Sequence, residues 1–99
     1  MKEEPNTSKK FLQSYLYTKK FGNFFVSTCY RKSSAQLDPS WYYETFAWKL
    51  DKDKRRTDWI ADNSGAEYPG AAFEQHIEII RQLELNGKFK GENENGYSK

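Results

Sequence analysis

The sequence predicts a small α+β protein, with a three- or four-stranded antiparallel sheet and one C-terminal helix packed on one face of that sheet. Three observations support this fold class. Residues 41–50 form the densest run of strand-favouring residues in the chain. A Gly22-Asn23 pair stands between aromatic residues, as in a tight hairpin turn. An apolar stripe with helical spacing runs up to Asn86-Gly87, a typical helix stop.

The N-terminal part of the chain allows two interpretations. Residues 1–8 are polar, and we expect a disordered tail there. Residues 9–21 fit either a strand that ends near Phe21 or a short helix, and we favour the strand because a hairpin turn follows. A second strand is expected from Phe24 to about Lys32. Its predicted core face carries Phe24, Val26, Thr28 and Tyr30.

The central strand, residues 41–50, follows a loop over residues 33–40 that contains an Asp-Pro turn signal. Because side chains alternate along a strand, its residues divide into two faces. We expect the first face to be the core, since it ends in three large apolar groups. The second face is amphipathic, and we expect a loop to cover it or a partner to bind it. The first face carries Tyr42, Glu44, Phe46, Trp48 and Leu50, and the second carries Trp41, Tyr43, Thr45, Ala47 and Lys49.

A mixed-charge run, residues 51–56, separates the central strand from a short fourth strand over residues 57–61. Such runs are typical of solvated hairpin loops, and we favour that interpretation. The alternative is an anion contact made by Lys54, Arg55 and Arg56. Residues 62–65 have turn composition and close the fourth strand.

The clearest helix covers residues 70–86, after Pro69, whose missing N–H suits a first helical position. Two adjacent lines of side chains form its apolar stripe, which we expect to cover the Phe46/Trp48 face of the sheet. Residues 88–99 should form a disordered tail, so that residues 9–87 make one domain. The two lines are Phe73, Ile77, Ile80 and Glu84, and Ala72, His76, Ile79 and Leu83.

Composition and net charge argue against several classes of function. The 99 residues fit one domain, and a formal net charge of +2 argues against strong non-specific nucleic-acid binding. The single cysteine, Cys29, excludes an intrachain disulfide and fits a reducing cytoplasm. One histidine and one cysteine do not make a zinc set, and no glycine-rich phosphate loop is present. We therefore predict no metal and no cofactor, and no membrane segment.

His76 and Glu44 are the candidate buried polar residues. His76 lies at the border of the apolar stripe, where a structural, hydrogen-bonded histidine is favoured over a general base. Glu44 on the expected core face needs a partner, for which His76 and Arg81 are the candidates, unless it stays wet at the end of the sheet. A Glu44–His76 pair would raise the pKa of the histidine.

Three short motifs carry a resemblance: Val26-Ser27-Thr28, then Tyr43-Glu44-Thr45-Phe46, then a helix with Ala72 and His76. They resemble short phage and bacterial proteins of uncharacterised function that read V-S-T-V, F-E-T-M and a helix with a G-H pair. The resemblance covers about residues 22–83. This chain departs from it with Tyr43 for Phe, Phe46 for Met and Gln75 for the glycine. It implies a phage or prophage setting and favours a contact between Glu44 and His76.

These observations favour a small, non-enzymatic, cytoplasmic protein-interaction module, in the form of a phage-type modulator or inhibitor of a host protein. The partner is a host protein or a second copy of the chain. A single-stranded nucleic-acid binder is the first alternative, and a small hydrolase that uses His76 is the second. The expected binding surface is the outer sheet face, with Phe25, Arg31, Trp41, Tyr43 and Lys49.

Overall fold

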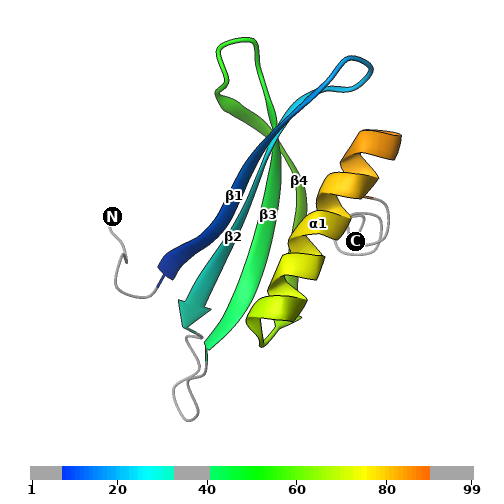
Figure 1. Ribbon diagram of the computed structural model, residues 1–99. Helices are drawn as coiled ribbons and strands as arrows, with labels where there is room; N and C mark the ends of the chain where they lie inside the picture. The colour runs from blue at the N-terminus through cyan, green and yellow to red at the C-terminus, as the bar shows by residue number, and fades with distance from the viewer. Residues whose placement is uncertain (1–7, 33–40, 90–99) are drawn as a thin grey trace, which may run out of the picture.

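The computed structural model describes residues 8–32 and 41–89, which form four strands followed by one helix (Figure 1). The elements are β1 (Ser8–Thr18), β2 (Gly22–Lys32), β3 (Trp41–Leu50), β4 (Arg56–Ala66) and α1 (Pro69–Asn86). The strands are antiparallel in the order β1-β2-β3-β4, which confirms the α+β fold. The predicted Asp-Pro loop, and the tails before residue 8 and after residue 89, lie outside the described residues.

The first hairpin shows that residues 9–21 contain a strand rather than a helix. Its turn lies earlier than predicted, over Lys19, Lys20 and Phe21, and the Gly22-Asn23 pair already belongs to β2. The Thr18 side chain closes this turn by accepting the Phe21 N–H (2.9 Å) and donating to the Gly22 carbonyl (2.7 Å). Gly22 has a φ of 97°, as the residue after a three-residue hairpin loop requires.

The second hairpin has the predicted solvated loop, and Asp51 organises it. The Asp51 carboxylate accepts the backbone N–H groups of Asp53 (2.8 Å) and Arg55 (2.9 Å). β4 is longer than expected, because residues 62–65 continue the strand instead of turning. The β3–β4 pairing has three register shifts, of which one lies beside residues 64–66 and two lie nearer the hairpin loop.

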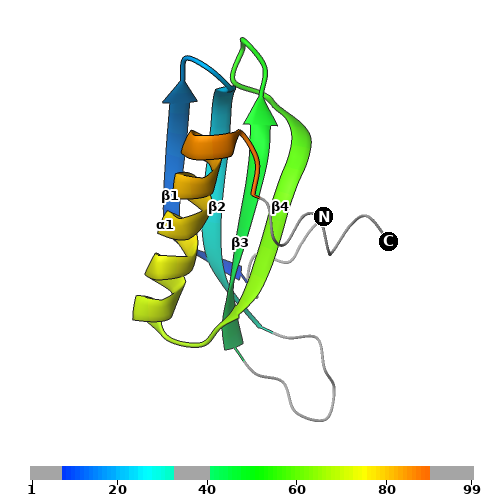
Figure 2. The same ribbon diagram turned by 90° about the vertical axis from the view of Figure 1, so that its right-hand side faces the viewer.

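The helix α1 lies against one side of the sheet (Figures 1 and 2) and contacts all four strands. It ends as predicted: Gly87 has a φ of 75° and donates its N–H to the Leu83 carbonyl at 2.9 Å. Phe89, which we expected in the tail, packs against the core cluster. That cluster consists of the buried residues Phe24, Val26, Ala47, Ala61, Ile79 and Leu83.

Most of β3 has its faces reversed relative to the prediction, although Leu50, which was predicted in the core, is buried as expected (6% exposed). Tyr43, Thr45 and Ala47 are buried under the helix, whereas Phe46 and Trp48 lie on the opposite, outer face. The reason is the pairing register with β2, which places Ala47 opposite the core residue Val26. Small side chains on β3 and β4 give the helix room to approach, as close packing of the core requires.

The helix faces the sheet with the second of the two predicted lines of side chains. Ala72, His76, Ile79 and Leu83 are buried, which agrees with that line. Phe73 and Ile77, from the other line, are 51% and 41% exposed. The expectation that Ile77 belongs to the core is therefore wrong.

Candidate functional site

The outer face of the sheet carries an aromatic array that crosses three strands. The Tyr15 ring lies 4.8 Å from that of Phe25, which lies 6.0 Å from that of Trp48. The Phe46 ring is 5.5 Å from that of Trp48, two residues further along the same strand, β3. Tyr17 stacks at 6.5 Å on Tyr15, and both tyrosines are more than half exposed. No helix or strand of the described residues covers this face (Figure 1). We call Tyr15, Tyr17, Phe25, Phe46 and Trp48 the aromatic array.

Two cations from the β3–β4 hairpin contact this array. The Arg56 guanidinium lies 4.7 Å from the Trp48 ring centre and 5.7 Å from that of Phe25. The Lys54 ammonium lies 5.5 Å from the Tyr17 ring centre. All three distances fit cation–π contacts. Of the three residues considered for an anion contact, these two therefore lie at the array, and Arg55 is exposed in the loop.

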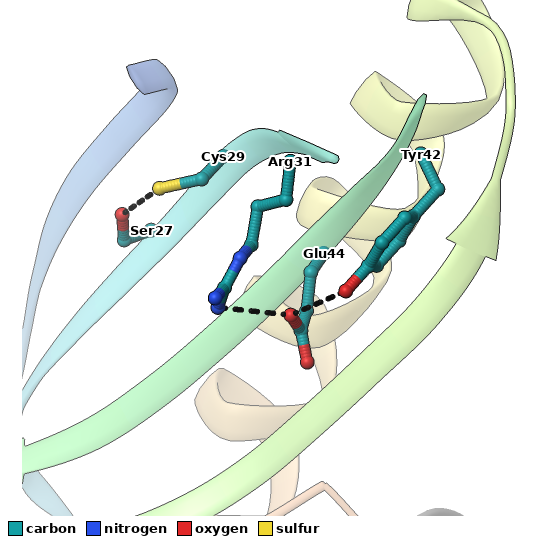
Figure 3. Close-up of polar contacts among 5 residues, drawn as sticks. All are labelled: Ser27, Cys29, Arg31, Tyr42 and Glu44. Atoms are coloured by element: carbon teal, nitrogen blue, oxygen red, sulfur yellow. Dashed lines mark hydrogen bonds and ion pairs between the residues drawn. The ribbon is translucent and has the colours of Figure 1, made fainter. Parts of the chain in front are cut away.

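The other end of the outer face is polar (Figure 3). Arg31 forms an ion pair with Glu44 at 3.2 Å, and the Tyr42 hydroxyl donates to the same carboxylate at 3.5 Å. Burial, reinforced by the hydrogen bond and charge of Glu44, raises the pKa of Asp62 to about 7, although Arg31 opposes this shift. Burial and Glu44 also raise the pKa of Tyr42. Two carboxyl groups thus share this end with one guanidinium.

Cys29 also lies on the outer face, on β2. Its sulfur is 3.7 Å from the Ser27 hydroxyl (Figure 3), which accepts a hydrogen bond from the Gln13 amide at 2.9 Å. Cys29 is a free, partly buried thiol in this polar row.

The residues predicted to form the binding surface divide between the two faces. Phe25 and Arg31 lie on the outer face, as expected. Trp41, Tyr43 and Lys49 lie on the helix side, because the faces of β3 are reversed. Tyr43 is only 8% exposed and packs in a second core cluster with Ala66 and Ala72, while Trp41 stacks on Tyr30 at 4.8 Å. A surface made of all five residues is therefore wrong.

His76 does not contact Glu44, which lies across the sheet from it. The imidazole is fully buried, with Nδ1 2.8 Å from the Thr28 hydroxyl and Nε2 2.9 Å from the Ser14 hydroxyl. The Thr28 and Thr45 hydroxyls are 2.6 Å apart, and the Gln75 amide donates to Thr45 at 2.8 Å. The predicted Glu44–His76 pair is wrong, and so is Arg81 as the alternative partner, since it pairs with Glu78.

One arrangement of protons satisfies every group in this network. Gln75 donates to Thr45, Thr45 to Thr28, and Thr28 to Nδ1 of a neutral imidazole. The Nε2–H then donates to Ser14. This arrangement explains why a buried histidine is tolerated without a carboxylate partner.

The electrostatics of His76 argue against a role as general base. Burial lowers the pKa of His76 to about 4, opposite to the rise expected from a carboxylate neighbour. A serine hydroxyl lies at a suitable distance, but the other ring nitrogen contacts a threonine rather than a carboxylate. The imidazole is also inaccessible to a substrate. The geometry is that of a structural histidine.

Sequence reasoning missed most of the partners in this network and most of the aromatic array. Thr28 and Thr45 both belong to the motifs quoted for the resemblance, and the structure places Thr28 against His76 and Thr45 against Thr28. An antiparallel alignment of Val26 with Ala47 would have placed them opposite each other. Tyr15 and Tyr17 could have been placed on one face of a strand with Gln13, because they alternate in the sequence with Leu12, Ser14 and Leu16.

Two classes of site were sought in the part of the chain that the structure describes, a metal cluster and a membrane-spanning helix. Within residues 8–32 and 41–89, no three His, Cys, Asp or Glu side chains gather as they would around a metal ion. The helix in the same residues is not apolar enough to cross a membrane. The aromatic array therefore stands out as the candidate binding surface.

Comparisons with known proteins found no relative of this chain. No protein-family model matches the chain, and no match is found among the curated proteins or the solved structures.

Proposed function

We propose that this protein is a small, non-enzymatic interaction module whose partner binds the outer face of the sheet. The observation that carries this proposal is the aromatic array, a set of large rings on a face that no described helix or strand covers. Exposed aromatic residues beside arginine and lysine have the composition of binding hot spots.

The architecture supports a division of labour between the two faces. The main core cluster lies between the helix and the sheet, on the side away from the outer face. The fold therefore does not need the exposed tyrosines for its core. Large rings left in water add little to stability and favour association. The outer face is therefore available for a partner without unfolding.

A protein is the partner class that the sequence analysis favours. A host protein bound by a phage-encoded modulator is the form that the resemblance implies, in a cytoplasmic setting. A second copy of the chain is also compatible, because an open sheet face can pack against its own copy about a two-fold axis.

Affinity capture with a double variant tests the proposal. Tyr15→Ala with Tyr17→Ala removes the two most exposed rings of the array and should abolish capture of partners from a lysate. Phe73→Ala with Ile77→Ala is the matched control, because it removes two half-exposed apolar side chains from the helix instead. Sedimentation of both variants reports any self-association. A folded tyrosine variant that keeps every wild-type partner would rule out the outer face.

A further inference from the structure

The net charge of +2 conceals a strong separation of charge along the sheet. The β1–β2 hairpin, residues 8–32, contains six cationic residues and no carboxylate. Residues 41–89 contain seven Lys and Arg against nine Asp and Glu, a net charge of −2. The low overall charge is therefore no argument against an anionic partner at the hairpin. The six cations are Lys9, Lys10, Lys19, Lys20, Arg31 and Lys32.

Cations lie beside the exposed end of the aromatic array. The turn after β1 holds Lys19, two residues after Tyr17 in the chain. The Lys20 ammonium instead lies 5.2 Å from the ring of Phe21, which packs against the core on the helix side. The turn after β3 lies at the same end of the sheet (Figure 1) and contributes Lys54 and Arg56, which already contact aromatic rings. Flat apolar rings and positive charge thus occupy one end of one open face.

The opposite end of that face has a different character. Glu44 and Asp62 lie there, with Arg31 held by Glu44. The strand register also places Lys9, Lys10 and Lys32 at this end. Asp51 and Asp53 lie in the loop at the other end, so charge alone does not choose between the two ends. The exposed rings of Tyr15 and Tyr17, with the cations that contact the array, select the turn end as the binding surface.

We infer that the turn end of the outer face binds single-stranded nucleic acid, an inference that rests on the proposed function of this face. Exposed bases stack on Tyr15 and Tyr17, because stacking on aromatic side chains suits any base. Phosphates lie against the lysines of the two turns. A duplex is a poorer ligand, since its bases already stack on one another. The cations beside the exposed rings are the reason to commit to nucleic acid here, and capture of a protein instead is an outcome of the tests below.

A binding titration with a fluorescent oligo(dT) of 15 nucleotides tests the inference. We expect a Kd of about 1–100 μM at low salt, in the range of sequence-independent binding. Tyr15→Ala with Tyr17→Ala should weaken binding at least ten-fold, because each stacked base contributes substantially. Phe73→Ala with Ile77→Ala should bind as the wild type does. An equally tight complex with the tyrosine variant would overturn the inference.

The salt dependence of the same titration tests the phosphate contacts. Each neutralised phosphate of a single strand contributes about 0.7 to the slope of log K against log salt. Lys19→Gln with Lys54→Gln should therefore reduce the slope by roughly 1.4. Arg81→Gln, on the exposed side of the helix, removes a charge far from the array and should leave the slope unchanged. Equal slopes for the lysine variant and the wild type would contradict the inference.

Two further probes separate this inference from the proposed function. Tighter binding of heparin than of oligo(dT), with no effect of the tyrosine variant, would show simple attraction of polyanions and overturn base stacking. No binding of oligo(dT) at low salt, together with a captured protein that is lost in the tyrosine variant, would overturn the inference and leave the proposed function standing. Loss of neither ligand in that variant would reject both.

Discussion

The two faces of the sheet differ in the size of the side chains that β3 contributes to them. Under the helix, β3 contributes Thr45 and Ala47, both fully buried, while its large side chains Phe46 and Trp48 lie on the open face. Thr45 and Ala47 leave room for the helix, while the large rings of the core come from Phe24 on β2 and Tyr43 near the start of β3. Phe46 and Trp48 thus lie on the face that is available for binding.

The faces also differ in their polar groups. The helix side holds neutral hydroxyl, amide and imidazole groups that hydrogen-bond to one another. The outer face holds charged groups, among them Arg31, Glu44 and Asp62. Neutral networks tolerate full burial far better than charges do, so each polar set suits its face.

The largest effect expected is on the helix side of the sheet. Leu83→Ala should reduce the free energy of unfolding by about 2–5 kcal/mol, because Leu83 is fully buried in the core cluster. Ile77→Ala is the control on the same helix, and at 41% exposure it should cost less than about 1 kcal/mol. Urea unfolding measures both. Equal losses would show that the helix is rotated relative to the arrangement described.

The next effect concerns the buried network. Thr28→Val keeps the shape of the side chain but leaves His76 Nδ1 without its hydroxyl partner, at a cost of about 1–3 kcal/mol. Thr57→Val makes the same chemical change at an exposed hydroxyl that donates to the Lys49 carbonyl, and should cost about 0.5 kcal/mol. Thermal unfolding compares the two. A smaller loss for Thr28→Val than for Thr57→Val would contradict the network.

Local signals in the sequence predicted the fold class, both hairpins and the helix. Hairpin turns and the helix stop depend on residues close in the chain, such as Asp51 and Gly87. The faces of β3 could not be predicted in this way, because aromatic residues occur on both of them and a shift of one residue exchanges them. The deciding contact is the pairing of Val26 with Ala47, which joins distant parts of the chain.

The candidate site was predicted only in part for the same reason. Phe25 and Arg31 were placed correctly because Phe24, Val26 and Thr28 alternate with them along β2 and face the core. The partner of His76 was predicted from charge, as Glu44, but the true partners are hydroxyls from two other strands. Composition showed an available carboxylate, whereas the register of three strands decides which side chains reach the histidine.

The pH dependence of the free energy of unfolding should report one titrating group on each face of the sheet. His76 has its folded-state pKa lowered to about 4, so its contribution is lost as pH falls from 6.5 towards 4, by at most about 1.4 kcal/mol per pH unit. Asp62 has its folded-state pKa raised to about 7, so its contribution is lost as pH rises from 3.8 towards 7. The two slopes oppose each other between pH 4 and 6.5.

Single variants separate these two slopes. In Asp62→Asn, the free energy of unfolding should rise with pH between 4 and 6.5, because His76 alone remains of the pair. In His76→Gln, it should fall with pH over the same window, because Asp62 alone remains. Urea unfolding at several pH values measures both slopes, and two variants with slopes of the same sign would contradict the assignment.

The smallest effect on the free energy of unfolding is expected for the exposed tyrosines of the outer face. Tyr15→Ala with Tyr17→Ala deletes two large rings, yet we expect the free energy of unfolding to fall by no more than about 1–2 kcal/mol. Both side chains are more than half exposed, and their chief contacts are the stack between them and that of Tyr15 on Phe25. Urea unfolding of the double variant, with Leu83→Ala alongside, measures the contrast. A loss as large as that of Leu83→Ala would mean that the outer face is a second core. A small loss together with impaired binding would separate the two roles, because binding would then fail in a protein that still folds.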